Sequence, residues 1–192
     1  YINLMEYIKN TDFSIAENYL DLQNKIDIES FIDYYACQMY IARNGDWPGS
    51  NEAMWKSKRN DSSNPYADRR WRWIMYDVNS CDTMMSSMLG FDSFSYLMED
   101  EIFSSIWRNP DFQQSFLSRF EELADTVFLP DTVNALIDGY EQEMNDAMML
   151  GARRFLGNYL ADDYFINGCE DVRTFYNNRR EIIFGYIDSY GQ

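Results

Sequence analysis

Three polar residues in the first half of the chain have the types and spacing that a phosphotransfer site needs. Asn51 follows Asp46 by five residues, and Asp77 comes directly after the aromatic segment 71–76. A carboxylate can accept a proton from an attacking hydroxyl, and amide and carboxylate oxygens hold the divalent ions that neutralise phosphates. We therefore predict that Asp46 accepts the proton and that Asn51 and Asp77 bind a metal ion.

The same residues also allow a purely structural interpretation. Aspartate and asparagine are common in turns, where their side chains bond to the nearby backbone. The spacing D-x-x-x-x-N therefore leaves two alternatives open. Asp46 and Asn51 either form a phosphotransfer site or only stabilise their own loop.

Composition narrows the possible chemistry. The chain has no histidine, which excludes serine-histidine triads and most zinc sites, so proton transfer must fall to Asp, Glu, Lys or Tyr. Acidic residues number 32 against 16 basic ones, and the net charge of -16 would repel nucleic acid and anionic membranes. We expect no nucleic-acid partner, and any nucleotide site must depend on divalent cations.

The cysteines and the apolar runs say little about the compartment. Cys37, Cys81 and Cys169 are odd in number and far apart, which argues against a disulfide framework. No apolar run approaches the roughly 18 residues that span a bilayer, so we expect no membrane-spanning segment. The sequence begins at Tyr1 rather than Met, which indicates a piece of a longer protein. The location therefore stays open.

The elements that must position these residues are mainly helices. Apolar residues recur at spacings of three and four over 28–42, with Asp27 as the N-cap, and this helix would lead the chain to Asp46. Shorter helices are predicted over 1–10 and 14–25. Together these segments place helical structure directly before the predicted catalytic loop.

A β-hairpin is predicted after this loop. The runs 52–58 and 71–76 read as strands, and the loop between them is rich in Asn, Ser and Pro. Antiparallel pairing would bring Asn51, before the first strand, and Asp77, after the second, to the same edge of the hairpin. Both would then lie beside Asp46.

The second half of the sequence is predicted to be helical. The segment 79–90 is rich in Ser and Met and reads as a loop. Asn109 and Pro110 open one helix, Pro130 opens a longer one that stops near Gly157, and a final helix follows. Basic pairs in these helices could hold a phosphorylated partner, but we interpret them as solvated helix faces: Arg153-Arg154 and Arg179-Arg180.

Two motifs together resemble one family. Residues 44–51 read N-G-D-W-P-G-S-N, and residues 71–77 read W-R-W-I-M-Y-D. In this order and spacing they resemble the CotH kinase family, named for the spore coat protein H kinases. Its members commonly read N-x-D-W-P-G-N-N followed by W-R-W-I-L-Y-D-L-D. The resemblance extends over roughly residues 1 to 150.

The resemblance implies an α+β fold, predominantly α-helical and protein-kinase-like. It implies transfer of phosphate from ATP, with Mg²⁺ or Mn²⁺, to Ser or Thr of bacterial spore coat, secreted or surface proteins, and hence an extracytoplasmic or cell-surface location. Position by position, Asp46 matches the catalytic aspartate and Asp77 the metal-binding one. Asn51 and Asn79 are the further metal ligands that this match suggests.

Departures from the family pattern keep a second function open. Ser50 stands where the family has an asparagine, Asn79 stands where it has a second aspartate, and 80–82 replaces its F-G-F run. A neutral amide holds divalent ions less tightly than a carboxylate does. The alternative is therefore a pseudokinase, a non-catalytic binding or scaffold domain of a bacterial surface protein.

The first 45 residues leave no room for a complete kinase. A kinase needs a glycine-rich cover, a strand lysine and its glutamate before the catalytic loop, but the residues before Asp46 read as mostly helical. We expect residues 1–192 to form a single domain, the C-terminal lobe with one β-hairpin beside the catalytic loop. Its partners would be a protein substrate and an N-terminal lobe absent from this chain, without which it would be inactive.

Overall fold

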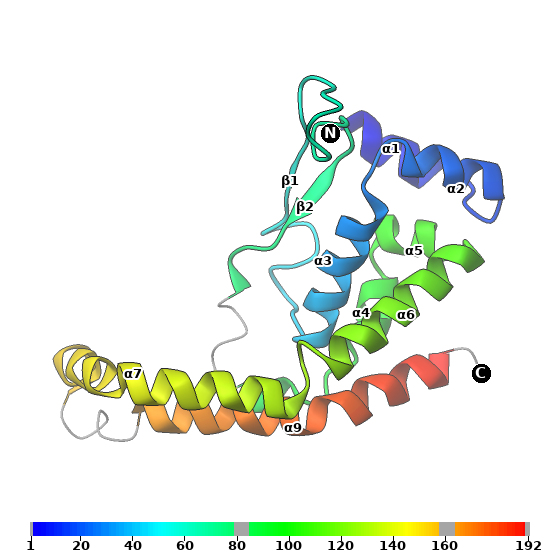
Figure 1. Ribbon diagram of the computed structural model, residues 1–192. Helices are drawn as coiled ribbons and strands as arrows, with labels where there is room; N and C mark the ends of the chain where they lie inside the picture. Colours follow the sequence, from blue (N-terminus) through cyan, green and yellow to red (C-terminus); the bar gives the residue numbers. More distant parts are fainter. Residues whose placement is uncertain (1, 79–84, 158–163, 191–192) are drawn as a thin grey trace. The chain divides into compact units, whose positions relative to one another are not determined.

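The computed structural model describes residues 2–78, 85–157 and 164–190 (Figure 1). The described part is mostly helical, with one small antiparallel sheet of two strands, which confirms the predicted α+β class with predominant helix. In chain order the elements are α1 (Ile2–Asn10), α2 (Ala16–Gln23), α3 (Ile28–Tyr40), β1 (Ala53–Trp55), β2 (Arg72–Ile74), the 3₁₀ helix η2 (Met85–Met88), α4 (Ser93–Met98), α5 (Glu101–Trp107), α6 (Pro110–Asp125), α7 (Pro130–Leu156) and α9 (Tyr164–Tyr190).

The backbone divides into two compact units. The first comprises Tyr1–Ser80 with Asp92–Glu122, and the second comprises Cys81–Phe91 with Leu123–Gln192. The structure describes three of the four predicted site residues, namely Asp46, Asn51 and Asp77. All three belong to the first unit. A single domain over residues 1–192 stays a prediction, because compact units need not be separate folding domains.

The start of α3 follows the predicted capping chemistry. The side chain of Asp27 accepts a hydrogen bond from the Ser30 N–H at 3.2 Å, which satisfies one of the free donors of the first turn. The same carboxylate forms an ion pair with Arg72 of β2 at 2.7 Å. The cap therefore also fixes the helix against the hairpin.

The end of α3 was not predicted correctly. The helix stops at Tyr40, two residues before the predicted end, because Ala42 adopts a left-handed conformation with φ of 57°. The N–H groups of Ala42 and Arg43 then bond to the carbonyls of Met39 and Gln38, at 3.2 and 3.1 Å. This is the Schellman arrangement, which usually has glycine at the left-handed position. It turns Arg43 back toward the helix end.

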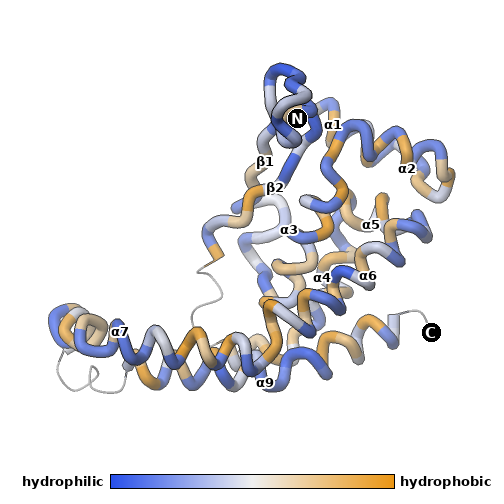
Figure 2. The backbone as a smooth tube through the Cα atoms, in the orientation of Figure 1, coloured by the Kyte–Doolittle hydropathy of each residue, from blue (hydrophilic) through white to orange (hydrophobic). Residues whose placement is uncertain are grey.

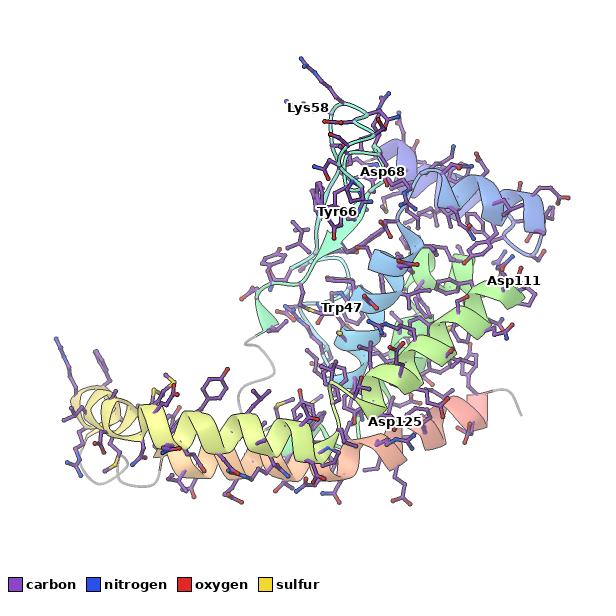
Figure 3. All side chains as sticks on the ribbon, viewed as in Figure 1. Trp47, Lys58, Tyr66, Asp68, Asp111 and Asp125 are labelled. Atoms are coloured by element: carbon purple, nitrogen blue, oxygen red, sulfur yellow. The ribbon has the colours of Figure 1, made fainter. Side chains whose placement is uncertain are left out.

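The predicted hairpin is present, but its strands are only three residues long. Pairing is antiparallel, and the paired residues are Ala53 with Ile74, Met54 with Trp73 and Trp55 with Arg72. Side-chain turns at Asp61 and Asn64 and a φ of 66° at Arg69 take the chain out of strand geometry at the long tip. Figure 3 labels Lys58 and Tyr66 in this tip.

Aromatic side chains fill the core of the first unit. The rings of Phe31 and Trp73 meet edge to face at 4.8 Å, and those of Phe31 and Tyr35 lie 4.3 Å apart. Asn109 caps α6 with its side-chain oxygen, as predicted, while its amide donates to the Phe13 carbonyl at 2.9 Å. Further buried rings complete this core: Phe94, Phe103, Phe112, Phe116 and Phe120.

In the second unit α7 and α9 lie side by side and run in opposite directions (Figure 1). The helix predicted from Pro130 to Gly157 is confirmed. The basic pair Arg179-Arg180 is not a solvated face, because Arg179 is fully buried and donates to the carbonyls of Leu89 and Phe91, both at 2.8 Å. Its guanidinium satisfies backbone that no helix or strand satisfies.

The predicted loop 79–90 lies partly outside the described residues, which resume at Met85 with η2. The short helices α4 and α5 were not predicted one by one, although each begins with an aspartate cap, Asp92 and Asp100. Cys37 and Cys169 are free thiols. Within residues 2–78, 85–157 and 164–190, none of the helices combines the length and the apolar character that spanning a membrane requires.

Candidate functional site

The loop after α3 adopts a backbone that only certain residues allow. Gly45 and Gly49 have φ of 73° and 97°, in the left-handed region that favours glycine, and the Trp47–Pro48 peptide is cis. The Trp47 ring is fully buried, 5.5 Å from the Tyr35 ring. Figure 3 labels this residue beside α3. The N-G-D-W-P-G motif therefore fixes the backbone on both sides of Asp46.

Asp46 and Asn51 meet directly. The amide nitrogen of Asn51 donates to Oδ2 of Asp46 at 2.7 Å. Because Asn51 uses its nitrogen here, its amide oxygen is directed elsewhere and can still serve as a ligand. The pair is therefore more than two separate turn residues, since each side chain orients the other.

The side chain of Arg43 binds the same carboxylate of Asp46. Its Nε donates to Oδ1 of Asp46 at 3.2 Å, and its Nη2 donates to Oδ2 at 3.0 Å. The arginine side chain is fully buried, whereas the Asp46 side chain is 29% exposed. A two-point contact of this kind fixes the plane of the carboxylate as well as its position.

Arg43 also connects this loop to the strand that leads to Asp77. Its Nη1 donates to the Tyr76 carbonyl at 3.2 Å, one peptide before Asp77. Asp77 has φ of 50°, which aspartate tolerates better than most residues, and its side chain is exposed.

The structure thus brings Asp46 and Asn51 into contact and places the backbone before Asp77 on the same guanidinium. Asn79, the fourth predicted site residue, lies outside the described residues. Within the described ranges, no group of three or more Asp, Glu, Cys or His side chains could hold a metal ion. Any metal ion would depend on the few oxygens of Asn51 and Asp77 together with oxygens from its ligand.

Tyr96 of α4 supports the loop from another side. Its hydroxyl donates to the Trp47 carbonyl at 2.8 Å and accepts from the Gly45 N–H at 3.2 Å. These two bonds flank Asp46 in sequence. Tyr96 and Pro48 also line a cleft of about 450 Å³ whose other polar residues are Lys9, Glu99, Asp100 and Glu101.

A partly buried carboxylate lies directly after Asn51. Oε1 of Glu52 accepts hydrogen bonds from Trp73 Nε1 at 2.7 Å and from the Tyr35 hydroxyl at 3.1 Å. Burial raises the pKa of Glu52 above its usual value, and burial likewise raises the pKa of Tyr35 well above its usual value. Glu52 therefore joins the loop to the aromatic core.

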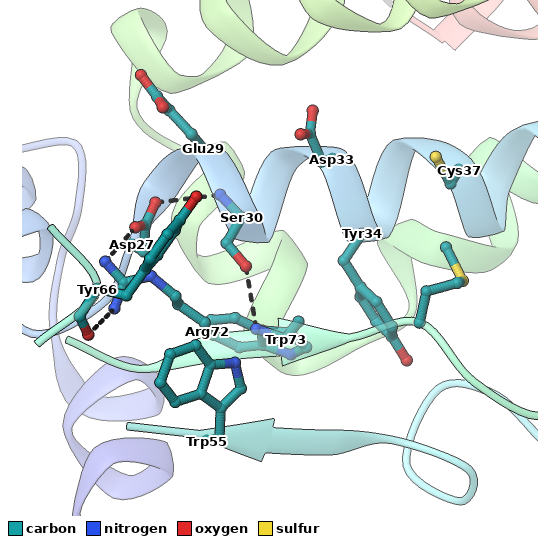
Figure 4. A pocket seen from close by; sticks show the side chains of 11 residues that line it. Asp27, Glu29, Ser30, Asp33, Tyr34, Cys37, Trp55, Tyr66, Arg72 and Trp73 are labelled. Carbon is teal, nitrogen blue, oxygen red and sulfur yellow. Dashed lines mark hydrogen bonds and ion pairs between the residues drawn. The ribbon is translucent and has the colours of Figure 1, made fainter. Parts of the chain in front are cut away.

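A second cleft, of about 510 Å³, lies beside α3 and the hairpin (Figure 4). Arg72 in its wall forms ion pairs with Asp27 at 2.7 Å and Asp68 at 2.8 Å, and it lies against the rings of Trp55 and Tyr66. The arginine lowers the pKa of Asp68 far below its usual range. None of the predicted phosphotransfer residues lines this cleft.

Comparison with known proteins decides the family. Residues 1–183 of the 192-residue chain match the family described as CotH kinase protein. The chain belongs to the CotH kinase family. The resemblance expected from the two motifs is therefore confirmed, and the match extends past residue 150 into the last helix of this CotH-family chain. The searches of curated proteins and of solved structures found no match.

Sequence reasoning missed three residues that build the site of this CotH-family chain. Arg43 stands next to the N-x-D motif, but nothing in its spacing distinguishes it from a solvated arginine. Tyr96 is 50 positions away from Asp46, and only the packing of α4 brings it to the loop. Glu52 could have been suspected, because a charged residue lies there at the start of the predicted strand 52–58.

Proposed function

We propose that this chain is the C-terminal lobe of a CotH-like kinase that catalyses metal-dependent transfer of phosphate from ATP to Ser or Thr hydroxyls of coat or surface proteins. The observation that carries the proposal is the shared guanidinium of Arg43, which binds both oxygens of Asp46 and the carbonyl that precedes Asp77. One buried residue thereby sets the positions of two residues that phosphotransfer requires.

The roles follow from exposure and chemistry. Asp46 is partly exposed and fixed in orientation, so it can accept a hydrogen bond from the acceptor hydroxyl and take its proton. The exposed carboxylate of Asp77 and the amide oxygen of Asn51 suit Mg²⁺ or Mn²⁺. When bound, the metal and ATP would supply the phosphoryl group and the neutralising charge. The groups that bind the nucleotide would come from an N-terminal lobe.

A specific observation favours a second candidate, a non-catalytic scaffold. Both oxygens of Asp46 already accept hydrogen bonds from Arg43 and Asn51. A carboxylate held by a guanidinium is a weaker base than a free one. The asparagine at position 79 also removes one charge that the family pattern supplies. A chain of this kind could retain the fold and bind a partner protein without transferring phosphate.

Phosphate transfer from labelled ATP to serine-containing acceptors, with Mg²⁺ or Mn²⁺, separates these functions. A version that includes an N-terminal lobe should transfer phosphate, and Asp46→Asn and Asp77→Asn should each reduce the rate by at least about 100-fold. Asp61→Asn in the exposed hairpin tip is the matched control, because it makes the same chemical change in a turn that is not part of the candidate site.

The substitution Asn79→Asp tests the weakened metal site. Restoring a carboxylate should tighten Mn²⁺ or Mg²⁺ binding and raise the transfer rate. If the protein with its N-terminal lobe transfers no phosphate, and Asn79→Asp changes neither metal affinity nor rate, the scaffold function is the correct one.

A further inference from the structure

α7 in the second unit carries a row of exposed apolar side chains that the proposed function does not use. Leu136, Tyr140 and Phe155 are 57%, 55% and 78% exposed, and Met144 and Met148 lie between them. Figure 2 shows hydrophobic residues recurring along this helix. We call these five residues the α7 stripe. Grouped apolar exposure on this scale marks an interaction surface.

The first part of the α7 stripe lies to one side of the face that α9 covers. Asn134 bonds to Asn177 of α9, and Glu141 bonds to Arg173 of α9, so these two residues mark the side of α7 that α9 covers. Successive residues turn by about 100° around a helix. On that geometry Leu136, Tyr140 and Met144 lie about 60° or more from Glu141, which leaves them open to a partner, whereas Met148 borders the covered side.

Two opposite charges border the stripe on one flank. Glu143 and Arg154 are 11 residues apart, which is about three helical turns, so they lie on the same flank. Across the described ranges neither residue has an ion-pair partner, and the Arg154 guanidinium lies over the Phe155 ring at 5.3 Å. The two charges are therefore available to an incoming surface.

This order of charges is complementary to itself. When two identical helices pair antiparallel about a twofold axis, the same flank of each helix faces the same flank of the other. Glu143 of one copy then lies opposite Arg154 of the other, and the pair occurs twice. In a parallel pair this flank would instead face the opposite flank of the partner, so Glu143 and Arg154 would not meet. The charge pattern thus favours a second copy in one orientation.

We propose that the α7 stripe is a self-association surface that pairs two copies of this chain with their α7 helices antiparallel. The twofold axis passes between Met148 and Met149, midway between the two charges. About this axis, Met144 of each copy lies opposite residue 153 of the other, about 3 Å along the helix from Gly151, and Tyr140 lies opposite Gly157. A side chain at Gly151 would meet no atom within 4 Å, so the partner's large side chains have room there.

The length of the stripe sets the expected strength of the dimer. From residue 136 to residue 155 a helix extends about 29 Å. One helix face of that length buries less than the roughly 800 Å² per partner of a standard interface. Each copy also carries a net charge of -16, which opposes association. We therefore expect a dimer with a dissociation constant in the micromolar range.

Sedimentation equilibrium of the 192-residue chain at about 0.15 M salt, where exposed charges act over only about 8 Å, tests the proposal. Glu143→Arg and Arg154→Glu should each weaken the dimer at least about tenfold, because each replaces two attractive pairs with two repulsive ones. The double variant should restore the wild-type constant to within about threefold. The single variants change the net charge in opposite directions, so net charge cannot explain a shared loss.

Two further variants separate the stripe from the helix as a whole. Met144→Glu should abolish the dimer, whereas Gln142→Arg, an exposed change away from the stripe, should leave it intact. Circular dichroism and melting should show that every variant is folded. A chain that stays monomeric up to about 100 μM, or a double variant no better than the single ones, would overturn the proposal.

Discussion

Arg43 is buried, and its charge is balanced by a carboxylate that is itself a candidate for catalysis. A fully buried guanidinium needs both an opposite charge and hydrogen-bond acceptors, and Asp46, Gln38 and the Tyr76 carbonyl provide them. The orientation of Asp46 is therefore a consequence of satisfying Arg43. Stability and function are coupled at this residue, which is not so for the exposed Asp77.

Replacement of Asp46 should therefore cost stability as well as activity. Asp46→Ala leaves a buried charge without its counter-ion, and we expect the free energy of unfolding to fall by about 2–3 kcal/mol. Asp77→Asn, at an exposed left-handed position that asparagine tolerates, should change it by less than about 0.5 kcal/mol. Urea unfolding measures both. Equal stability of Asp46→Ala and wild type would show that the contact with Arg43 has little effect.

Glu52 gives the site a pH dependence whose direction follows from its raised pKa. In the window between the unfolded and folded pKa values, the folded state binds the proton more tightly, so the contribution of Glu52 to stability falls as pH rises. We expect the difference in unfolding free energy between wild type and Glu52→Gln to shift in favour of wild type as pH is lowered from about 7 toward 4.5.

That difference is best followed by urea unfolding at several pH values. Both neutral-donor hydrogen bonds to Glu52 end on Oε1, which glutamine also has, so the variant keeps the contacts with Tyr35 and Trp73. Any constant loss from the change at the other oxygen cancels in the comparison across pH. A difference that grows in the opposite direction would contradict the assignment.

At the scale of the elements, the helix ends place stricter requirements on residue type and chain direction than the helix interiors do. The Schellman end of α3 directs Arg43 to the loop, although Ala42 occupies the position where glycine is usual. α7 ends at Gly157, which has φ of 87° and ψ of 155°. Only glycine adopts that conformation readily. The interior of α7 has no such requirement.

Two glycine substitutions, one inside α7 and one at the residue that ends it, should therefore have opposite effects. Gly139→Ala, inside the helix and with no atom within 4 Å of the new methyl, should raise the free energy of unfolding by about 0.5–1 kcal/mol. Gly157→Ala should lower it by about 1–3 kcal/mol because of the required φ and ψ. Urea unfolding and hydrogen exchange of α7 amides measure the change. Two effects of the same sign would contradict this account.

For the molecule as a whole, the charge balance governs what it can bind. With a net charge of -16, nucleotide phosphates would be repelled unless divalent cations intervene. The first 45 residues form α1, α2 and α3 rather than a phosphate-gripping β-rich lobe. The proposed C-terminal lobe would therefore carry the candidate catalytic residues, and the groups that hold the nucleotide would come from an N-terminal lobe.

The 192-residue chain alone should accordingly bind ATP weakly. A ligand that binds only the native state stabilises it by RT ln(1 + [L]/Kd), so a dissociation constant of a millimolar or more leaves melting almost unchanged. Millimolar ATP with Mg²⁺ should raise the melting midpoint by about a degree or less. A rise of several degrees that Asp77→Asn abolishes would mean that the nucleotide site is complete in this chain.

The sequence by itself determined the family, the helical class, the hairpin and the main helix caps. Those features depend on local rules: Asp27 and Asn109 cap helices because of their own short acceptors, and 44–51 with 71–77 form a motif pair in sequence. It could not give the exact strand lengths, which depend on side-chain turns in the hairpin tip.

Only the tertiary structure decided which residues hold the candidate site together. Arg43, Tyr96 and Glu52 act through contacts between segments far apart in sequence, and burial of a charge or hydroxyl has no local signature. The same holds for Arg179, which looked like part of a solvated pair and is instead buried against backbone carbonyls. Long-range packing determines where a buried polar group finds its partners, and sequence spacing does not encode it.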